Sequence, residues 1–190
     1  MQFVYSHLFT AIWVLWCAYW MIVSRNVKQT ARSESQWSKV QRLVPLAVAA
    51  LLLWVPTLPG GFLCEKLIPQ TAWTFWIGAA ITVAGLLFSV WARVHLGRNW
   101  SAVVTLKQEH ELITSGPYGL VRHPIYTGLL VAFIGTAIAR AEWRGVLAVA
   151  LVLISFWHKL RLEEAWLTEE FGDVYRDYRR RVSALIPFVI

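Results

Sequence analysis

The sequence predicts an all-α, polytopic membrane protein, and three observations lead to this class. The 190-residue chain is 57% apolar and only 15% charged, whereas about a quarter of the residues in a soluble domain are charged. Its apolar residues fall into runs close to the ~20 residues that a helix needs to cross a bilayer. Trp73 and Trp76 open one of these runs, as expected for the aromatic belt of a membrane helix.

Five apolar runs predict about five transmembrane helices in a single domain. They cover residues 5–23, 43–63, 72–95, 125–141 and 143–160. So few residues separate the last two runs that their helices must form a tight hairpin. We divide the domain, residues 1–190, into an N-terminal two-helix part, residues 1–71, and a core, residues 72–190.

The distribution of basic residues predicts the orientation of the chain. Five Lys or Arg residues lie in the connector 24–42, four between residues 93 and 122, and six between residues 159 and 181, whereas three lie on the other side. Cytoplasmic segments carry such an excess. We therefore expect an integral protein of the cell inner membrane with its N-terminus outside and its long connector and tail in the cytoplasm. The net charge of +7 follows from this topology and does not indicate a nucleic-acid partner.

Two helical patterns flank the candidate site. Small residues at helical spacing in the fourth run predict close helix packing; they are Gly128, Ala132, Gly135 and Ala139. Apolar residues at helical spacing in the tail predict an amphipathic helix; they are Phe171, Val174, Tyr175, Tyr178 and Val182. We interpret the arginines of its other face as lying on anionic lipid head groups; they are Arg176, Arg179, Arg180 and Arg181. The apolar residues 185–190 are expected to pack back on the bundle.

The first candidate site is the start of the fourth helix. Pro124 suits the first position of a helix, and His123 before it is disfavoured in helical geometry. Arg122 and His123 would therefore lie at the positive end of a helix, where a carboxylate or phosphate can bind. An arginine that reaches lipid phosphate, with His123 as a simple cap, explains the same residues equally well. The turn signal before this segment aims Tyr118 toward the same place.

The second candidate site lies where the fifth run ends. On a helix, Arg161 shares a face with Glu164, and Lys159 shares one with Glu163. These residues form either surface ion pairs or a site for a zwitterion, with a carboxylate for its ammonium group. Residues 110–113, two polar side chains followed by two apolar ones, come just before the predicted turn, and we expect them to form an extended segment whose backbone contacts a ligand. The sequence has no G-x-G-x-x-G, no P-loop and no Cys/His metal cluster, so we expect no metal and a reaction that depends mainly on positioning.

Several motifs occur in a recognisable order. They are Leu96-Gly97-Arg98-Asn99-Trp100-Ser101, His110-x-Leu112-Ile113-x-x-Gly116-Pro117-Tyr118, Val121-Arg122-His123-Pro124-x-Tyr126-x-Gly128, Arg161-x-Glu163-Glu164 and Phe171-Gly172-x-x-Tyr175-x-x-Tyr178. As an ordered set, which covers about half of the chain, they resemble the isoprenylcysteine carboxyl methyltransferase family and its prokaryotic relatives.

The resemblance implies an integral-membrane methyltransferase that uses S-adenosylmethionine without a Rossmann domain. It implies that the cofactor is bound by His110, Glu111, Leu112, Ile113, Tyr118, Arg122, His123, Pro124, Ile125, Tyr126, Glu163 and Glu164. A glutamate takes the amino group of the cofactor; counting back from Phe171-Gly172 favours Glu163, with Glu164 as the alternative. The substrate carboxylate meets the catalytic basic residue Arg161, although the spacing to Glu163 selects Lys159.

The resemblance also implies the reaction. A lipophilic or lipidated acceptor, most simply the carboxylate of an isoprenylcysteine-like substrate, enters from the bilayer, while the cofactor enters from the cytoplasm. The methyl group moves in one in-line displacement. The alternatives are a phospholipid or fatty-acid methyltransferase, an enzyme that resembles NADPH-dependent sterol reductases, and a non-enzymatic transporter or scaffold.

Overall fold

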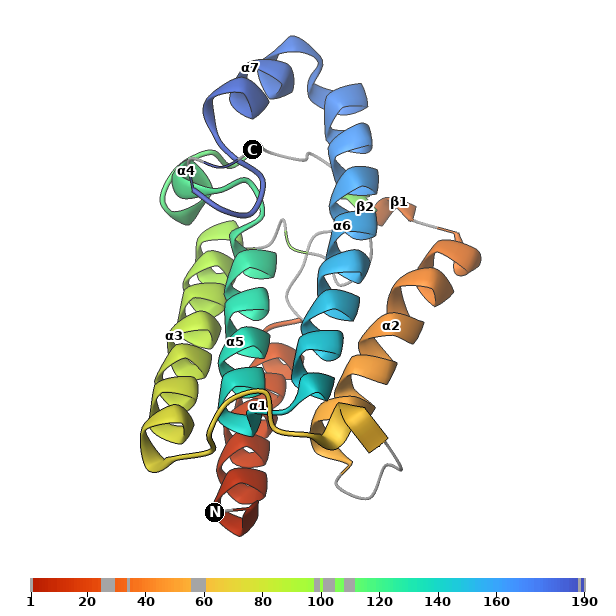
Figure 1. Cartoon of the computed structure of the whole chain (residues 1–190). Helices are drawn as coiled ribbons and strands as arrows, with labels where there is room; N and C mark the ends of the chain where they lie inside the picture. The colour runs from red at the N-terminus through yellow and green to blue at the C-terminus, as the bar shows by residue number, and fades with distance from the viewer. Residues whose placement is uncertain are drawn as a thin grey trace.

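The computed structural model describes residues 2–24, 30–33, 35–55, 61–97, 100, 105–107, 112–187 and 189. Five long helices run side by side and form an elongated bundle (Figure 1). They are α1 (Gln2–Val23), α2 (Gln36–Trp54), α3 (Ala72–Leu96), α5 (Pro124–Arg140) and α6 (Trp143–Phe171). Each matches one of the five predicted helices. Within the described residues, α3 and α6 are long and apolar enough to cross a membrane.

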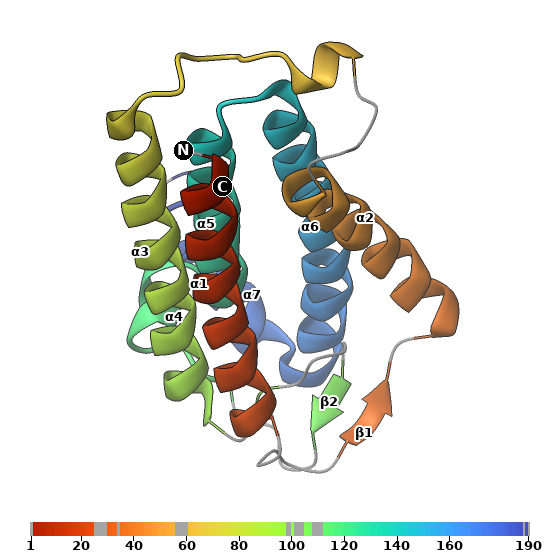
Figure 2. The ribbon, with the colours of Figure 1, turned by 90° about the horizontal axis from the view of Figure 1, so that it is seen from below.

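The arrangement of the bundle follows from its contacts. Helix α5 packs between α3 and α6, and α2 packs on α6. Helix α1 lies against α3 and α5, as Figure 2 shows from a second direction. The short helices α4 (Pro117–Leu120) and α7 (Asp173–Arg181) lie at one end with the C-terminus, and the N-terminus lies at the other end (Figure 1).

Helices α3 and α5 approach each other closely, as the stripe of small residues predicts. A Cβ atom added to Gly85 would lie 2.5 Å from the carbonyl oxygen of Gly128, and one added to Gly135 would lie 2.5 Å from the backbone nitrogen of Thr82. Both distances are too short for any side chain. The glycines therefore allow the two backbones to meet and fix the position of α5, which begins at the candidate site.

Helix α1 is attached to this pair by indole hydrogen bonds. Trp13 Nε1 donates to the hydroxyl of Thr136 (3.2 Å), and Trp16 Nε1 donates to the hydroxyl of Ser89 (2.9 Å). Each bond satisfies a polar group inside an otherwise apolar contact.

The predicted tight hairpin between α5 and α6 is confirmed, and one carboxylate holds it together. Glu142 accepts from Lys66 Nζ (2.8 Å), Arg140 Nε (3.0 Å) and Arg144 Nε (2.5 Å). Arg140 Nη1 also donates to the carbonyl oxygen of Leu53, so the hairpin is tied to the end of α2. The three basic residues that the charge count leaves on the non-cytoplasmic side thus converge on one residue.

Three features differ from the sequence-based expectation. Helix α2 begins at Gln36, because the hydroxyl of Ser35 accepts from the backbone nitrogen of Ser38 (3.2 Å) and caps the helix. Helix α6 continues through Phe171 and so carries the candidate glutamates on the same rigid element. The fold is also not purely helical: β1 (Thr30–Ser33) pairs antiparallel with β2 (Thr105–Lys107). A short 3₁₀ helix, η1 (Gly61–Cys64), precedes α3.

Candidate active site

The C-terminal segment packs back on the bundle, as predicted, and contacts the start of α5. The backbone nitrogens of Arg122 and His123 donate to the carbonyl oxygens of Ser183 (2.8 Å) and Ala184 (3.0 Å). The hydroxyl of Thr127 donates to the carbonyl oxygen of Leu185 (2.7 Å). Pro124 is the first residue of α5, and His123 before it has a non-helical φ of −122°, as the proline rule predicts. Two free N–H groups near this helix end are therefore satisfied by the tail.

Arg122, His123 and Arg179 surround the buried Glu164. We call these four residues the upper cluster. Glu164 Oε1 accepts from Arg122 Nε (2.7 Å) and lies 3.2 Å from His123 Nε2, and its Oε2 lies 3.3 Å from Arg179 Nε. Arg122 Nη1 also donates to the carbonyl oxygens of Arg179 (3.1 Å) and Val182. Arg122 therefore already bonds protein oxygens from three directions.

The ionisation of Glu164 follows from these contacts. Glu164 lies beyond Leu160, the last residue of the apolar part of α6. Burial alone would raise the pKa of its carboxyl group, but the hydrogen bonds from His123 and Arg122 and their charges lower this pKa to about 2. Glu164 is therefore a carboxylate at any physiological pH, and its charge holds Arg122 and His123 in place.

A lower cluster surrounds Glu163. The hydroxyl of Tyr126 donates to Glu163 Oε1 (2.6 Å), and Lys159 Nζ lies 3.8 Å from the same oxygen. His123 Nδ1 lies 3.6 Å from Glu163 Oε2, so each nitrogen of His123 faces a different glutamate. The side chain of Glu163 is 22% exposed and that of Glu164 is 8% exposed. Glu163 is therefore the more accessible carboxylate for a ligand.

Aromatic rings form the wall of the lower cluster. The Tyr126 ring stacks on His123, with centroids 5.5 Å apart and planes at 7°, and its centroid lies 5.2 Å from that of Phe156. Lys159 Nζ lies 5.0 Å from the centroid of Tyr126. A cation thus already lies over an aromatic ring and beside a carboxylate, which is the environment that binds an organic cation.

Tyr118 holds α4 against the bundle. It is buried, and its hydroxyl lies 3.5 Å from the carbonyl oxygen of Ala92 at the end of α3. Its own carbonyl oxygen accepts from the hydroxyl of Tyr178 (2.6 Å). Burial raises the pKa of Tyr178 to about 12, so this hydroxyl stays protonated and remains a donor.

The remaining predicted cofactor residues fall into three groups. Pro124 and Ile125 are buried at the start of α5. Leu112 and Ile113 are half-buried and lie outside regular secondary structure, and Ile113 packs against the main apolar core. His110 and Glu111 lie outside the described residues.

The structure distinguishes the two basic residues that the sequence left as alternatives. Lys159 is buried beside Glu163 and Tyr126. Arg161 is exposed, and its guanidinium lies 5.8 Å from the ring centroid of Trp157. Within the described residues, Glu164 pairs with Arg122, His123 and Arg179 and not with Arg161, although the two share a helical face.

One residue of the site was not identified from the sequence. We assigned Arg179 to a lipid-facing side of the tail helix, whereas it contacts Glu164. The spacing along the tail helix predicts this contact, because Arg179 follows the buried Tyr175 by four residues and so lies on the same face of α7.

Comparisons with known proteins place the chain in a family. A family model described as phospholipid methyltransferase matches residues 73–174, slightly more than half of the chain. The chain is 37% identical over 101 residues to the protein-S-isoprenylcysteine O-methyltransferase of Schizosaccharomyces pombe, which covers 52% of this chain and 43% of the relative. It is 34% identical over 146 residues to the Mus musculus protein of the same name, with coverages of 75% and 51%.

A solved structure supports the same assignment. The eukaryotic intramembrane Ras methyltransferase ICMT (isoprenylcysteine carboxyl methyltransferase) aligns with a TM-score of 0.54 and 25% sequence identity, covering 84% of this chain and 55% of that one. The chain thus spans about half of the length of these relatives. The region matched by the family model contains Tyr126, Lys159 and both glutamates of the two clusters. The chain therefore belongs to the phospholipid methyltransferase family and is similar, in particular, to the isoprenylcysteine carboxyl methyltransferases, as its motifs predict.

Proposed function

We propose that the protein is a membrane methyltransferase that uses S-adenosylmethionine to methylate the carboxylate of a lipophilic, isoprenylcysteine-like acceptor. The names of the relatives support the reaction class. The observation that carries the proposal is the lower cluster, in which Lys159, Glu163 and Tyr126 lie together where the apolar part of α6 ends. In this proposal the acceptor reaches these residues from the bilayer and the cofactor reaches them from the aqueous side.

The residues of the lower cluster fit the methyl donor. S-adenosylmethionine, when bound, supplies an electrophilic methyl group on a sulfonium that a carboxylate oxygen can take in one displacement. Glu163 would accept hydrogen bonds from the ammonium group of the donor, in the place that Lys159 Nζ occupies at 3.8 Å. The face of Tyr126, which already has a cation over it, would stabilise positive charge. By the family resemblance, Leu112, Ile113, Tyr118 and Ile125 would contact the rest of the donor.

Lys159 has the second role in the proposed reaction. Once Glu163 holds the ammonium of the donor, Lys159 Nζ becomes available for the carboxylate of the acceptor and orients it toward the methyl group. Phe156 and Tyr126 keep water from this point, which strengthens both charge interactions. A carboxylate needs no general base, so Tyr126, whose hydroxyl bonds Glu163, acts by holding that glutamate. We therefore assign the acceptor to Lys159 in preference to Arg161.

We also propose that all five long helices cross the cell inner membrane, with the N-terminus outside and the site facing the cytoplasm. The charge asymmetry supports this orientation. The arrangement at the opposite end supports it further, because Lys66, Arg140 and Arg144 are neutralised in part by Glu142. Lipid and the lipophilic acceptor are the expected partners.

Cofactor titration tests the proposal. The purified protein is titrated with S-adenosylmethionine and, separately, with NADPH, and its thermal unfolding is followed. We expect stabilisation by S-adenosylmethionine alone. Glu163→Gln should weaken its binding by about tenfold or more, because a charge-assisted hydrogen bond is lost. Glu170→Gln, an exposed carboxylate on the same helix, is the matched control. Stabilisation by NADPH but not by S-adenosylmethionine would exclude a methyltransferase.

The family description favours a second candidate acceptor, the amine of a phospholipid. The two acceptors give chemically different products. Cells that express the protein are labelled with methyl-labelled S-adenosylmethionine, and their lipids are extracted and treated with base. Base-labile label indicates a methyl ester and supports the carboxylate acceptor, whereas base-stable label indicates N-methylation and supports the phospholipid.

A further inference from the structure

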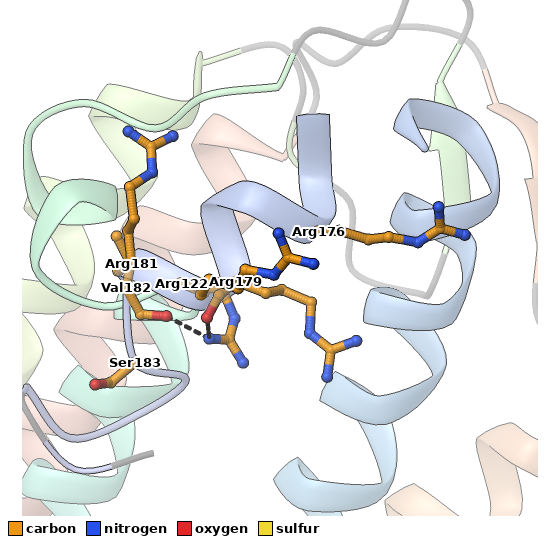
Figure 3. Close-up of a pocket in the computed structure, with 7 residues that line it drawn as sticks. Arg122, Arg176, Arg179, Arg181, Val182 and Ser183 are labelled. Atoms are coloured by element: carbon orange, nitrogen blue, oxygen red, sulfur yellow. Dashed lines mark hydrogen bonds between the residues drawn. The ribbon is translucent and has the colours of Figure 1, made fainter. Parts of the chain in front are cut away.

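A cavity separate from the lower cluster lies at the end of the bundle that carries α7. It is a cavity of about 570 Å³ lined by Arg122, by the four arginines of α7 and by the segment Val182–Ser183 (Figure 3). Its lining does not include Tyr126, Lys159 or Glu163. The four arginines of α7 and Arg122, from another element, thus line the same cavity, although the side chains of Arg176 and Arg181 point in different directions (Figure 3).

The charges around this cavity are not balanced. Arg176 Nη1 lies 2.6 Å from Asp173 Oδ1, and Arg180 Nη1 lies 3.0 Å from Asp177 Oδ1. Within the described residues, the ion pairs of the five lining arginines involve three carboxylates, those of Asp173, Asp177 and Glu164. A guanidinium carries five N–H donors. The contacts within the described residues engage a single nitrogen of each arginine of α7, so most donors remain available.

A buried phenol lies beside the same charges. Tyr175 is 1% exposed, and its hydroxyl has no hydrogen-bond partner among the described residues. Burial raises the pKa of Tyr175, and the nearby Glu164 carboxylate raises it further. The hydroxyl therefore keeps its proton. A buried donor without an acceptor is costly, but Tyr175 is not among the residues that line the cavity.

We propose that the arginine-lined cavity is a binding site for a phosphate group, separate from the methyl-transfer site. Five arginines line this cavity, and guanidinium groups match the oxygens of a phosphate, which they can bind in pairs. The phosphate belongs either to a soluble molecule or to a lipid head group.

The length of α6 indicates how far the cavity lies from the membrane, and therefore which phosphate can reach it. Eleven residues of α6 follow Leu160, its last apolar-run residue, which corresponds to roughly 16 Å at 1.5 Å per residue. The polar layer of a bilayer is only about 5–8 Å thick on each side. Glu164, which Arg122 contacts, lies only four residues past Leu160, roughly 6 Å. With α6 along the membrane normal, the cavity therefore extends from the polar layer outward, within reach of lipid head groups and of soluble phosphates. Both sources are therefore tested.

The first experiment uses a soluble probe. Binding of inorganic pyrophosphate to the full chain, purified in a neutral detergent, is measured by titration calorimetry. We expect saturable binding that Arg180→Gln weakens by about tenfold, since one charge-assisted contact is lost. Asp177→Asn should tighten binding, because it removes the carboxylate that competes for Arg180. Lys39→Gln, which removes a positive charge on α2, should leave binding unchanged.

The second experiment uses lipid. The protein is reconstituted in phosphatidylcholine bilayers with and without phosphatidic acid. If lipid supplies the phosphate, phosphatidic acid raises the unfolding temperature of the wild type and not of Arg180→Gln. Pyrophosphate binding in the first experiment supports a soluble source instead.

Three results would overturn the proposal. The first is the absence of a response in both experiments. The second is an equal effect of Arg180→Gln and Lys39→Gln, which would show only general charge attraction. The third is competition between pyrophosphate and S-adenosylmethionine, which would place the cavity within the cofactor pocket. The first two results do not bear on methyl transfer, so the two proposals can fail independently, whereas the third also bears on where the cofactor binds.

Discussion

Glu164 is the carboxylate on which Arg122, His123 and Arg179 converge, and its replacement by Gln removes this charge at nearly constant size. The pKa of Glu164 falls from an ordinary value of 4.5 to about 2 in the folded protein. Each pKa unit corresponds to about 1.4 kcal/mol, so the ionised carboxylate stabilises the fold by about 3 kcal/mol at neutral pH. For a chain of this size, Glu164→Gln should therefore lower Tm by roughly 6–12 °C.

The pH dependence of this loss provides a sharper test. Because the folded-state pKa is lowered, the stabilisation is fully present above pH 4.5 and is lost as the pH falls toward about 2. We expect the Tm difference between wild type and Glu164→Gln to be constant near neutral pH and to shrink in acid. Thermal unfolding in detergent across this pH range measures it.

The control for this test is Glu170→Gln, which removes an exposed carboxylate from the same helix. Its expected effect is within about 0.5 kcal/mol at every pH. The reasoning would be refuted by a Glu164→Gln variant as stable as the control, or by a Tm difference that persists unchanged at low pH.

Three further predictions concern the acceptor, the helix packing and the hairpin. Lys159→Met should raise KM for the acceptor by about tenfold or more while cofactor affinity changes little, whereas the exposed Arg161→Met should leave KM unchanged; equal effects of both would contradict the assignment. Gly135→Ala should destabilise the protein by about 1–3 kcal/mol, because its Cβ would lie 2.5 Å from backbone, whereas Gly119→Ala, whose Cβ would lie 3.4 Å from its nearest neighbour, should cost less in the same unfolding assay. Glu142→Gln leaves buried cations without their carboxylate and should cost about 3–5 kcal/mol; a smaller loss than for Gly119→Ala would show that the hairpin does not depend on this charge.

The sequence predicted helix positions well where local signals decide them. The third run was expected over residues 72–95, and α3 is Ala72–Leu96. Pro124 marks the start of α5, because proline fits the first turn of a helix and disfavours helical geometry at the residue before it. The prediction failed at α2 and α6, where polar residues continue the helix beyond the apolar run. Apolar length measures what can lie in a membrane and not where a helix ends.

For the candidate site too, the sequence predicted some features and not others. The sequence identified Arg122, His123 and both glutamates as candidates, because charged residues at the ends of apolar helices are costly without a role. It could not assign their partners. Glu163 and Glu164 are neighbours in the chain, yet one faces Tyr126 and Lys159 and the other faces Arg122 and Arg179.

The sequence by itself determined the helical membrane class, the segments in which positive charge gathers and the tight hairpin, and it proposed the residues for methyl transfer. Each depends on composition or on spacing along one element. Only the tertiary structure decided that Glu164 is locked among cations, that Lys159 and not Arg161 lies beside Glu163, and that the arginines of α7 surround a cavity. Which side chains meet depends on the rotation of each helix against its neighbours. The close contact of α3 with α5 and the returning C-terminal segment fix that rotation through residues far apart in the chain.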